Sequence, residues 1–264
     1  MAGPRLTPGA VVSDQRDTFD EVAAEYDAVR PLYPIELFDD LAVVAGGPGQ
    51  PVLEVGCGSG QATAGLLGCG WTVVAVDPGA ELIALAKARL TSVEFHVGRF
   101  ETFAPQPASF RLVASAQAWH WIDPSISFPK AAAALQPGGW LAIFGHVPLS
   151  PPPEILQLLE PIYAAIAPEL WRPPPQAWYL PEGPVRSLID ASGLFGPVTC
   201  KAYAWSEPVS AAGFVRQLRT RSDYNVISRG RRDRLLAEVE TVLAPLGALS
   251  LRNETHLYLA QLKS

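Results

Sequence analysis

The sequence of 264 residues predicts an α/β protein with a doubly wound, mostly parallel sheet of seven strands. Two observations carry this prediction. Short apolar runs alternate with helix-compatible segments along the first half of the chain, which is typical of a parallel sheet buried on both faces. A glycine-rich turn, Gly56-Cys-Gly-Ser-Gly60, follows the first apolar run and precedes a helical segment. This places the turn at the carboxyl end of a parallel strand, where α/β folds bind nucleotides.

The limits of each expected strand and helix follow from the hydrophobic pattern and from the positions of proline and glycine. The strands are expected at residues 52–55, 72–76, 93–97, 112–116, 140–144, 198–205 and 256–262. The helices are expected at residues 13–29, 35–45, 61–67, 80–90, 125–135, 185–191, 209–219 and 231–243. Residues 1–12 are predicted to be a flexible tail. Ser13 can cap the first helix, and Pro31 and Pro34 prevent this helix from continuing. An amino-terminal helical cap is therefore expected ahead of the sheet.

A proline-rich insertion follows the fifth strand. Residues 147–184 contain 11 prolines, so this stretch is predicted not to form a long regular helix. Long segments of this kind are often lids or binding loops, but an ordered surface excursion whose aromatic side chains pack on the core fits equally well.

Composition and charge exclude several classes of function. A hydrophobic content of 48% supports a full core, and a net charge of −6 argues against a general binder of nucleic acids or anionic membranes. The three cysteines and four histidines show no metal-ligand spacing, so no metal is predicted. Without a signal-peptide core or a long apolar span, a cytoplasmic protein is expected, as a monomer or weak homodimer.

The carboxyl-terminal half is richer in basic residues. Residues 1–150 contain 8 Lys and Arg against 15 Asp and Glu, whereas residues 151–264 contain 12 against 11. The excess lies in the arginines at positions 216, 219, 221, 229, 231, 232 and 234. Most are expected on a solvated helix face, and one or two that turn inward could hold an anionic substrate.

The glycine loop and Asp77 together indicate a ribose-containing ligand. The dinucleotide fingerprint needs a glycine where this chain has Gln61, so the pattern here is G-x-G-x-G. Asp77 ends the second predicted strand, 21 residues after Gly56, at the offset where a carboxylate reaches ribose hydroxyls. The alternative is an aspartate that only caps the next helix.

Four successive motifs resemble those of class I S-adenosylmethionine (SAM)-dependent methyltransferases of the type 11 small-molecule group, which includes trans-aconitate-type enzymes. The motifs are residues 53–60, 75–78, 115–121 and 135–139, and residues 19–34 are similar to the group's amino-terminal helix. The resemblance covers residues 17–146 and is loose over 147–264. It implies a Rossmann-like methyltransferase fold in which residues 13–146 bind SAM and residues 147–264 complete the same domain and line the acceptor site.

The resemblance also implies a function and its alternatives. The expected activity is methyl transfer from SAM to a small-molecule acceptor, with a carboxylate favoured. A SAM-binding sensor or partner subunit without turnover is an alternative. An NAD-linked oxidoreductase is a further one, against which Gln61 and the Pro-Gly-Gly turn at 137–139 weigh.

The implied cofactor contacts follow the motifs. The backbone of the glycine loop faces the methionine half of SAM, Asp77 holds the ribose, and Pro78 lies beside the adenine. Arg99 stands where many relatives have an aspartate for the adenine amino group, so the Phe100 backbone or Glu101 is expected to supply that contact. The full set of cofactor residues is Tyr26, Gly56, Gly58, Gly60, Asp77, Pro78, Phe100, Glu101, Ala116 and Gln117.

The implied acceptor contacts come from the amino-terminal segment, the motif after the fourth strand and the carboxyl-terminal half. They are Arg30, Tyr33, Trp119, His120 and Arg221. Trp119 or Trp121 could line the sulfonium, because aromatic faces attract cations, or could pack under the following helix. His120 is the one candidate general base, but a structural hydrogen bond is the stronger interpretation, and no catalytic residue is predicted to be essential.

Overall fold

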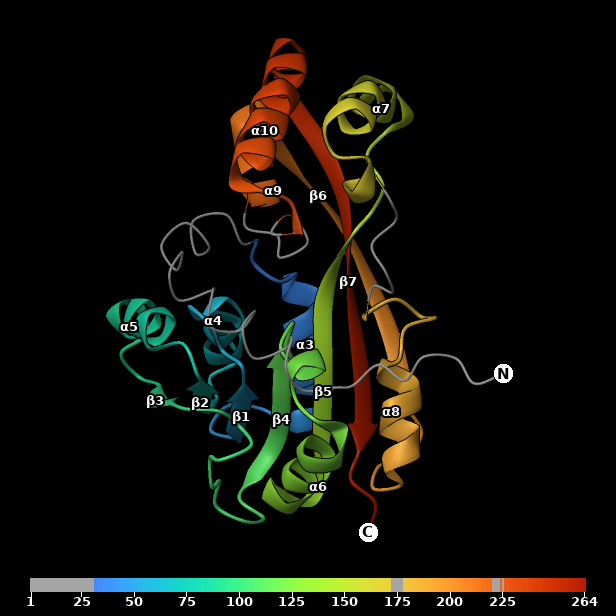
Figure 1. Cartoon of the computed structure of the whole chain (residues 1–264). Helices are drawn as coiled ribbons and strands as arrows, with labels where there is room; N and C mark the ends of the chain where they lie inside the picture. Colours follow the sequence, from blue (N-terminus) through green and yellow to red (C-terminus); the bar gives the residue numbers. More distant parts are fainter. Residues whose placement is uncertain (1–30, 172–177, 220–223, 225) are drawn as a thin grey trace.

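The computed structural model describes residues 31–171, 178–219, 224 and 226–264. Within these residues, seven strands form one sheet in the order β3-β2-β1-β4-β5-β7-β6 (Figure 1). β1 to β5 are parallel, and β7 is antiparallel to both β5 and β6. The predicted doubly wound, mostly parallel sheet of seven strands is confirmed.

The elements follow the predicted alternation. The strands are β1 (Pro51–Val55), β2 (Thr72–Asp77), β3 (Glu94–Val97), β4 (Phe110–Ala116), β5 (Leu135–Pro148), β6 (Thr199–Ser210) and β7 (Ala248–Gln261). The α-helices are α3 (Ile35–Ala45), α4 (Gln61–Gly68), α5 (Ala80–Arg89), α6 (Pro124–Ala134), α7 (Pro153–Ile166), α8 (Val185–Ser192), α9 (Ala211–Arg219) and α10 (Arg229–Leu243). Short 3-10 helices lie at Trp119–Trp121, Pro168–Leu170 and Ala244–Leu246.

Helices cover both faces of the sheet because successive strand residues point to opposite sides. On one face, Leu41 of α3 and Leu66 of α4 belong to the same buried cluster as Phe144 of β5. On the other, Phe128 of α6 and Ile189 of α8 pack in a cluster with Ile143, the residue before Phe144. The sequences of the central strands are therefore mostly apolar, without the alternation of a strand that is exposed on one face.

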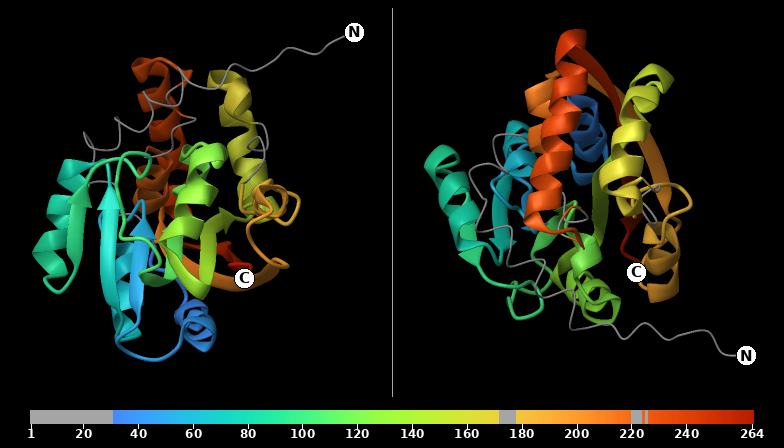
Figure 2. Two further views of the ribbon diagram at one scale, coloured as in Figure 1. Left: turned by 90° about the horizontal axis from the view of Figure 1, so that it is seen from below. Right: turned by 45° about the horizontal axis from the view of Figure 1, so that its top comes forward.

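A third hydrophobic cluster lies beyond the sheet. β6 and β7 pair over twelve residues, so their far ends project past the last residues of β4 and β5 as a two-stranded ribbon. Leu249 and Leu251 on this ribbon pack with side chains of α7, α9 and α10. Figures 1 and 2 show these helices gathered above the carboxyl ends of the parallel strands, on the side where α/β folds bind ligands.

The prediction that the proline-rich insertion forms no long regular helix is wrong for residues 153–166. α7 spans 14 residues and includes Pro161 in its interior. Pro153 at its start costs little, since the first helical residue has no intrahelical N–H bond to lose. Burial of Ile155, Leu159 and Tyr163 in the third cluster offsets the cost of Pro161, which is about 3 kcal/mol for an interior proline.

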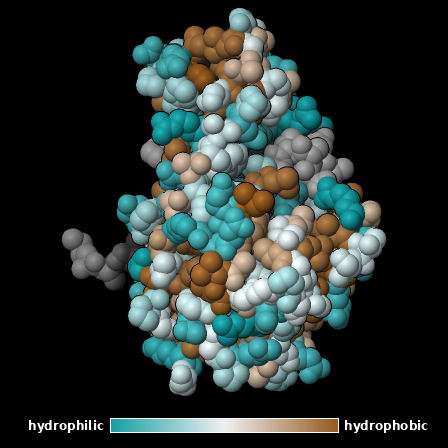
Figure 3. All heavy atoms as spheres, turned by 180° about the vertical axis from the view of Figure 1, so that it is seen from behind, coloured by the Kyte–Doolittle hydropathy of each residue, from teal (hydrophilic) through white to brown (hydrophobic). Residues whose placement is uncertain are grey.

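Apolar side chains on the surface are scattered. Leu32, Ile35 and Val43 are exposed around α3, and Figure 3 shows separate apolar patches among hydrophilic side chains on the rear face. In the part of the chain that the structure describes, no helix is long and apolar enough to cross a membrane. The predicted tail at 1–12 and helix at 13–29 lie outside the described residues.

Candidate functional site

The glycine loop turns sharply between β1 and α4, with positive φ angles at Gly56, Gly58 and Gly60. A Cβ on Gly56 would lie 2.1 Å from the Cβ of Ala118, and one on Gly60 would lie 2.8 Å from a methyl group of Leu90. These two glycines are therefore needed for packing against neighbouring loops. A Cβ on Gly58 would meet nothing within 4 Å, so Gly58 alone of the three borders open space.

Asp77, at the end of β2, joins this loop to α5. Its Oδ2 accepts the N–H of Gly58 and its Oδ1 accepts the N–H of Gly79, both at 2.8 Å. The side chain is 8% exposed. The Gly79 N–H belongs to the N-cap residue of α5, which has no side-chain capping hydrogen bond, so Asp77 fixes the turn ahead of the helix rather than capping it. A carboxylate oxygen can accept more than one hydrogen bond, which is the chemistry that a ribose diol requires. Pro78 follows and is exposed.

Glu54 is a buried acid that sequence analysis did not assign to the site. It is 1% exposed on β1, and neither carboxyl oxygen has a hydrogen-bond partner among the described residues. Burial raises the pKa of this carboxyl to about 8; the nearby Thr63 hydroxyl opposes the rise and the Asp77 carboxylate adds to it. A glutamate inside an apolar strand, Val52-Leu-Glu-Val55, was the available signal.

The loop after β3 is held by a lysine of α6, the helix that packs on the same face of the sheet as the Phe100 ring. Lys130 of α6 donates to the carbonyl oxygens of Phe100, Glu101 and Phe103, at 3.0, 2.6 and 2.8 Å. The Phe100 ring is buried in the core, so a contact between this residue and a ligand would have to be made by its backbone. Glu101 is partly exposed on the same loop.

The end of β4 contains a strained turn. Gln117 has a φ of 54°, which is uncommon for a residue other than glycine, and its N–H donates to the Phe144 oxygen of β5 at 2.9 Å. Such strain is typical of functional sites, where surrounding structure enforces it. Ala116 and Gln117 are both partly exposed at this carboxyl edge, as the implied methionine contacts require.

The two tryptophans of the next motif differ. Trp119 is 3% exposed and packs between Phe100 and Phe128, with ring centroids at 6.1 and 5.4 Å. This matches the packing alternative rather than contact with an acceptor. Trp121 is partly exposed and lies beside the ring of His120 at 4.7 Å.

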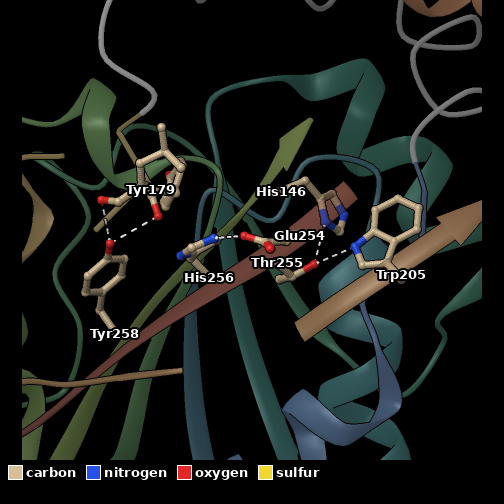
Figure 4. A network of polar contacts seen from close by, with 8 residues as sticks. His146, Tyr179, Trp205, Glu254, Thr255, His256 and Tyr258 are labelled. Carbon is tan, nitrogen blue, oxygen red and sulfur yellow. Dashed lines mark hydrogen bonds and ion pairs between the residues drawn. The ribbon is translucent and has the colours of Figure 1, made fainter. Parts of the chain in front are cut away.

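Tyr33 lies at the beginning of α3 and faces the sheet. Its ring stacks on His146 at 4.2 Å and meets the edge of Phe144 at 5.0 Å. His146 in turn bonds through Nδ1 to the Thr255 hydroxyl, which also accepts the indole N–H of Trp205 (Figure 4). A cavity of about 440 Å³ opens beside Tyr33 and is lined also by Glu36, Tyr203 and Trp205.

Three predicted residues, Tyr26, Arg30 and Arg221, lie outside the described residues. The structure brings the loop residues, Asp77, Phe100, Glu101, Ala116 and Gln117 to the carboxyl edge of the parallel strands. Tyr33 and His120 lie on opposite faces of β5, because Tyr33 packs on Phe144 and His146, whereas His120 contacts Tyr179, whose ring lies over Gly145. Sequence analysis missed Glu54, Lys130, Tyr203 and Trp205. In the described ranges, no group of three or more His, Cys, Asp or Glu side chains is arranged to hold a metal ion.

This sheet order, with β7 reversed and a glycine loop after β1, defines a Rossmann-like fold of the class I methyltransferase kind. The family model described as "Methyltransferase domain" matches residues 53–143. Residues 53–143 are thus similar to type 11 methyltransferases, and the predicted resemblance is confirmed.

Curated relatives match about half of the chain or less. An uncharacterized methyltransferase of Mycobacterium bovis is 36% identical over 130 residues, covering 49% of this chain and 52% of the relative. Trans-aconitate 2-methyltransferase of Rhizobium meliloti is 30% identical over 108 residues, covering 40% of this chain and 42% of that protein. The chain thus spans about half the length of the curated relatives it matches.

Solved structures match more of the fold. A protein assigned as a type II methyltransferase from Anaeromyxobacter dehalogenans aligns with a TM-score of 0.63 at 27% identity, over 89% of this chain and 97% of its own. Phosphoethanolamine N-methyltransferase 2 of Haemonchus contortus, solved with S-adenosyl-L-methionine, aligns with a TM-score of 0.53 at 17% identity, over 98% of this chain and 62% of its own. The second likeness shows the fold alone.

Proposed function

We propose that this protein is a SAM-dependent methyltransferase that acts on a small-molecule acceptor. The observation that carries the proposal is the carboxyl of Glu54, which has no hydrogen-bond partner among the described residues and lies behind a glycine loop in which Gly58 borders space that the described residues leave open. A buried carboxyl without hydrogen bonds is unfavourable, and a cationic ligand group would satisfy it. The α-ammonium group of SAM has this chemistry.

The remaining residues of the edge fit the other parts of SAM. The Gly58 backbone would lie against the methionine half, and Asp77 would accept the ribose hydroxyls while it continues to hold the Gly58 and Gly79 N–H groups. Pro78 and the loop that Lys130 fixes would enclose the adenine. Ala116 and Gln117 would border the methionine carboxyl end, and Tyr26 would complete the pocket.

Bound SAM supplies an electrophilic methyl group on a positively charged sulfur. The protein's contribution is to hold the acceptor in line with that bond and to exclude water, which can account for a large share of a rate enhancement by itself. A carboxylate acceptor is already ionised near neutral pH and needs no base. We therefore assign no essential catalytic residue.

The acceptor site would lie between Tyr33, the motif after β4 and the ribbon of β5, β7 and β6. The cavity of about 440 Å³ beside Tyr33 falls within the range that accommodates small molecules. A carboxylate is the favoured acceptor, in keeping with the trans-aconitate 2-methyltransferase among the relatives, and Arg30 and Arg221 are the arginines proposed to hold it. We expect a cytoplasmic monomer or weak homodimer.

Direct binding and methyl transfer test this function. Isothermal titration with S-adenosylhomocysteine and with NAD should show binding of the first only; binding of NAD alone would support an oxidoreductase instead. Labelled SAM is then offered with a panel of carboxylic acids, including trans-aconitate, and with a metabolite extract. Binding without transfer to any acceptor would favour the alternative of a sensor or partner subunit.

Arginine variants test the carboxylate. Arg30→Gln and Arg221→Gln should each raise the KM of an acid acceptor, because a bidentate arginine pair is strong and directional. Arg229→Gln is the matched control, since that side chain is 87% exposed on α10. Activity confined to neutral or cationic acceptors, or an acid-methylating enzyme indifferent to both variants, would contradict the assignment.

A further inference from the structure

His120 lies in a cluster of aromatic rings drawn from two distant parts of the chain. Its ring lies 4.7 Å from Trp121, 5.7 Å from Trp178 and 5.8 Å from Tyr179, measured between centroids. Its Nδ1 is 3.1 Å from the Tyr179 hydroxyl. The last two residues belong to the proline-rich insertion, so this insertion packs directly on the motif that follows β4.

Tyr179 is itself fixed from three sides. Its side chain is 5% exposed, and a Cβ on Gly145 of β5 would lie 2.6 Å from its ring, so the ring rests directly on the strand backbone. The hydroxyl of Tyr258 on β7 donates to the carbonyl oxygens of Tyr179 and Leu180, at 3.1 and 2.7 Å (Figure 4). A ring held this closely by backbone and hydrogen bonds presents its own hydroxyl in one direction.

We propose that Tyr179 is a positioning residue for methyl transfer, which holds His120 with the ring proton on Nε2. This rests on the function proposed above and assigns the Tyr179 hydroxyl as donor and the His120 Nδ1 as acceptor. A neutral imidazole protonates only one of its nitrogens, so an accepting Nδ1 leaves the proton on Nε2. In this form the Nε2 of His120 is a hydrogen-bond donor rather than a base, which is the chemistry that suits a carboxylate acceptor.

The contact between Tyr179 and His120 gives a physical reason for the packing of the proline-rich insertion on the motif after β4. The insertion lies outside residues 53–143, which match the family model, while His120 lies within them. Through Tyr179, the insertion would set the orientation and hydrogen-bonding character of a residue proposed to border the acceptor. Recognition of an anionic acceptor would thereby depend on both halves of the chain.

Tyr179→Phe is the sharpest test because it keeps the ring over Gly145 and removes only the hydroxyl. Nitrogen-15 spectra of histidine side chains report which ring nitrogen carries the proton, and the chain has only four histidines. His120→Asn assigns the signal of His120. Wild-type protein should show the Nε2–H form for His120, and Tyr179→Phe should show a mixture of both forms and a changed titration midpoint.

Two further variants separate positioning from general structure. Tyr258→Phe removes the anchors of the Tyr179 backbone and should change the His120 signal in the same direction to a smaller extent. Tyr163→Phe removes a buried hydroxyl that bonds to Tyr224 within the third hydrophobic cluster. This variant should leave the His120 signal unchanged. An unchanged His120 signal in folded Tyr179→Phe, or a wild-type proton on Nδ1, would overturn the proposal.

Kinetics give the functional readout with any acid from the panel that is methylated. Tyr179→Phe should lower kcat about three- to tenfold, the loss expected for one hydrogen bond, and leave the affinity for S-adenosylhomocysteine unchanged. If the wild type is active and Tyr179→Phe has the same kcat, the positioning role is refuted and the proposed function is not. A wild type that fails to bind S-adenosylhomocysteine would refute the proposed function, and the nitrogen-15 spectra would still decide the Tyr179–His120 contact.

Discussion

Replacement of Glu54 by glutamine should make the stability of the ligand-free protein less sensitive to pH. Burial raises the pKa of this carboxyl from 4.5 in the unfolded chain to about 8 in the folded protein. Between these values, the folded state holds a proton that the unfolded state has lost. Stability therefore falls as pH rises through this window, and the loss is complete above pH 8.

The magnitude follows from the pKa difference. Each pKa unit corresponds to about 1.4 kcal/mol, so the wild type should lose on the order of 3–5 kcal/mol from Glu54 between pH 4.5 and pH 8. Glutamine cannot ionise and avoids this loss. It introduces a buried amide, whose cost is the same at every pH and does not affect the slope.

Urea unfolding of ligand-free protein across pH 5 to 8.5 measures the effect. The unfolding free energy of Glu54→Gln minus that of the wild type should rise steadily with pH. Glu160→Gln is the control, because this glutamate is exposed on α7 and its replacement is not expected to change the slope. Parallel curves for Glu54→Gln and wild type would refute the reasoning, and saturating S-adenosylhomocysteine should shrink the difference if its ammonium group pairs with Glu54.

Three further variants test the cofactor and acceptor assignments. Asp77→Ala should weaken SAM binding by about 1.5–3 kcal/mol through loss of a charge-assisted contact, and unchanged affinity in folded protein would exclude the ribose role. Gly58→Val should abolish binding, because a branched side chain would fill the open space and resist a φ of 53°, whereas Gly230→Val, at an exposed position of α10, should not affect binding. His120→Asn should retain turnover within about tenfold of wild type, and a loss of about 10²–10⁴-fold with SAM binding intact would restore a general base and an acceptor that must be deprotonated.

The central parallel strands could be predicted because they are buried on both faces, whereas β3 at the sheet edge is only partly buried. β1, β2 and β4 are continuous apolar runs, and their predicted limits differ from the observed ones by at most two residues. β7 was predicted at about half its length. Its first part alternates Leu249 and Leu251 with exposed residues, because that ribbon is covered on one face only, and the expected signal of continuous hydrophobicity is missing there.

Site residues were predictable where chemistry lies in one short motif. Asp77 and Gly58 follow from spacing, and the structure joins them by a hydrogen bond. Lys130 could not be predicted, since its role depends on α6 lying against the loop after β3. Gly145 gave a partial signal: a lone glycine within a strand marks close approach of another group, although the sequence does not reveal that the group is Tyr179.

The residues that would line the acceptor site could not be predicted fully from the sequence, because β5, β6 and β7 extend beyond the end of β4. β4 ends at Ala116, opposite Phe144 in β5, and β5 continues to Pro148 in pairing with β7. Residues beyond Phe144 therefore stand above the edge where the methyl group would be presented. Their neighbours come from the insertion, the amino-terminal segment and β6, which no local pattern links together. An acceptor preference built from such contacts can change by substitution in any of these segments while the glycine loop, Asp77 and Glu54 stay the same.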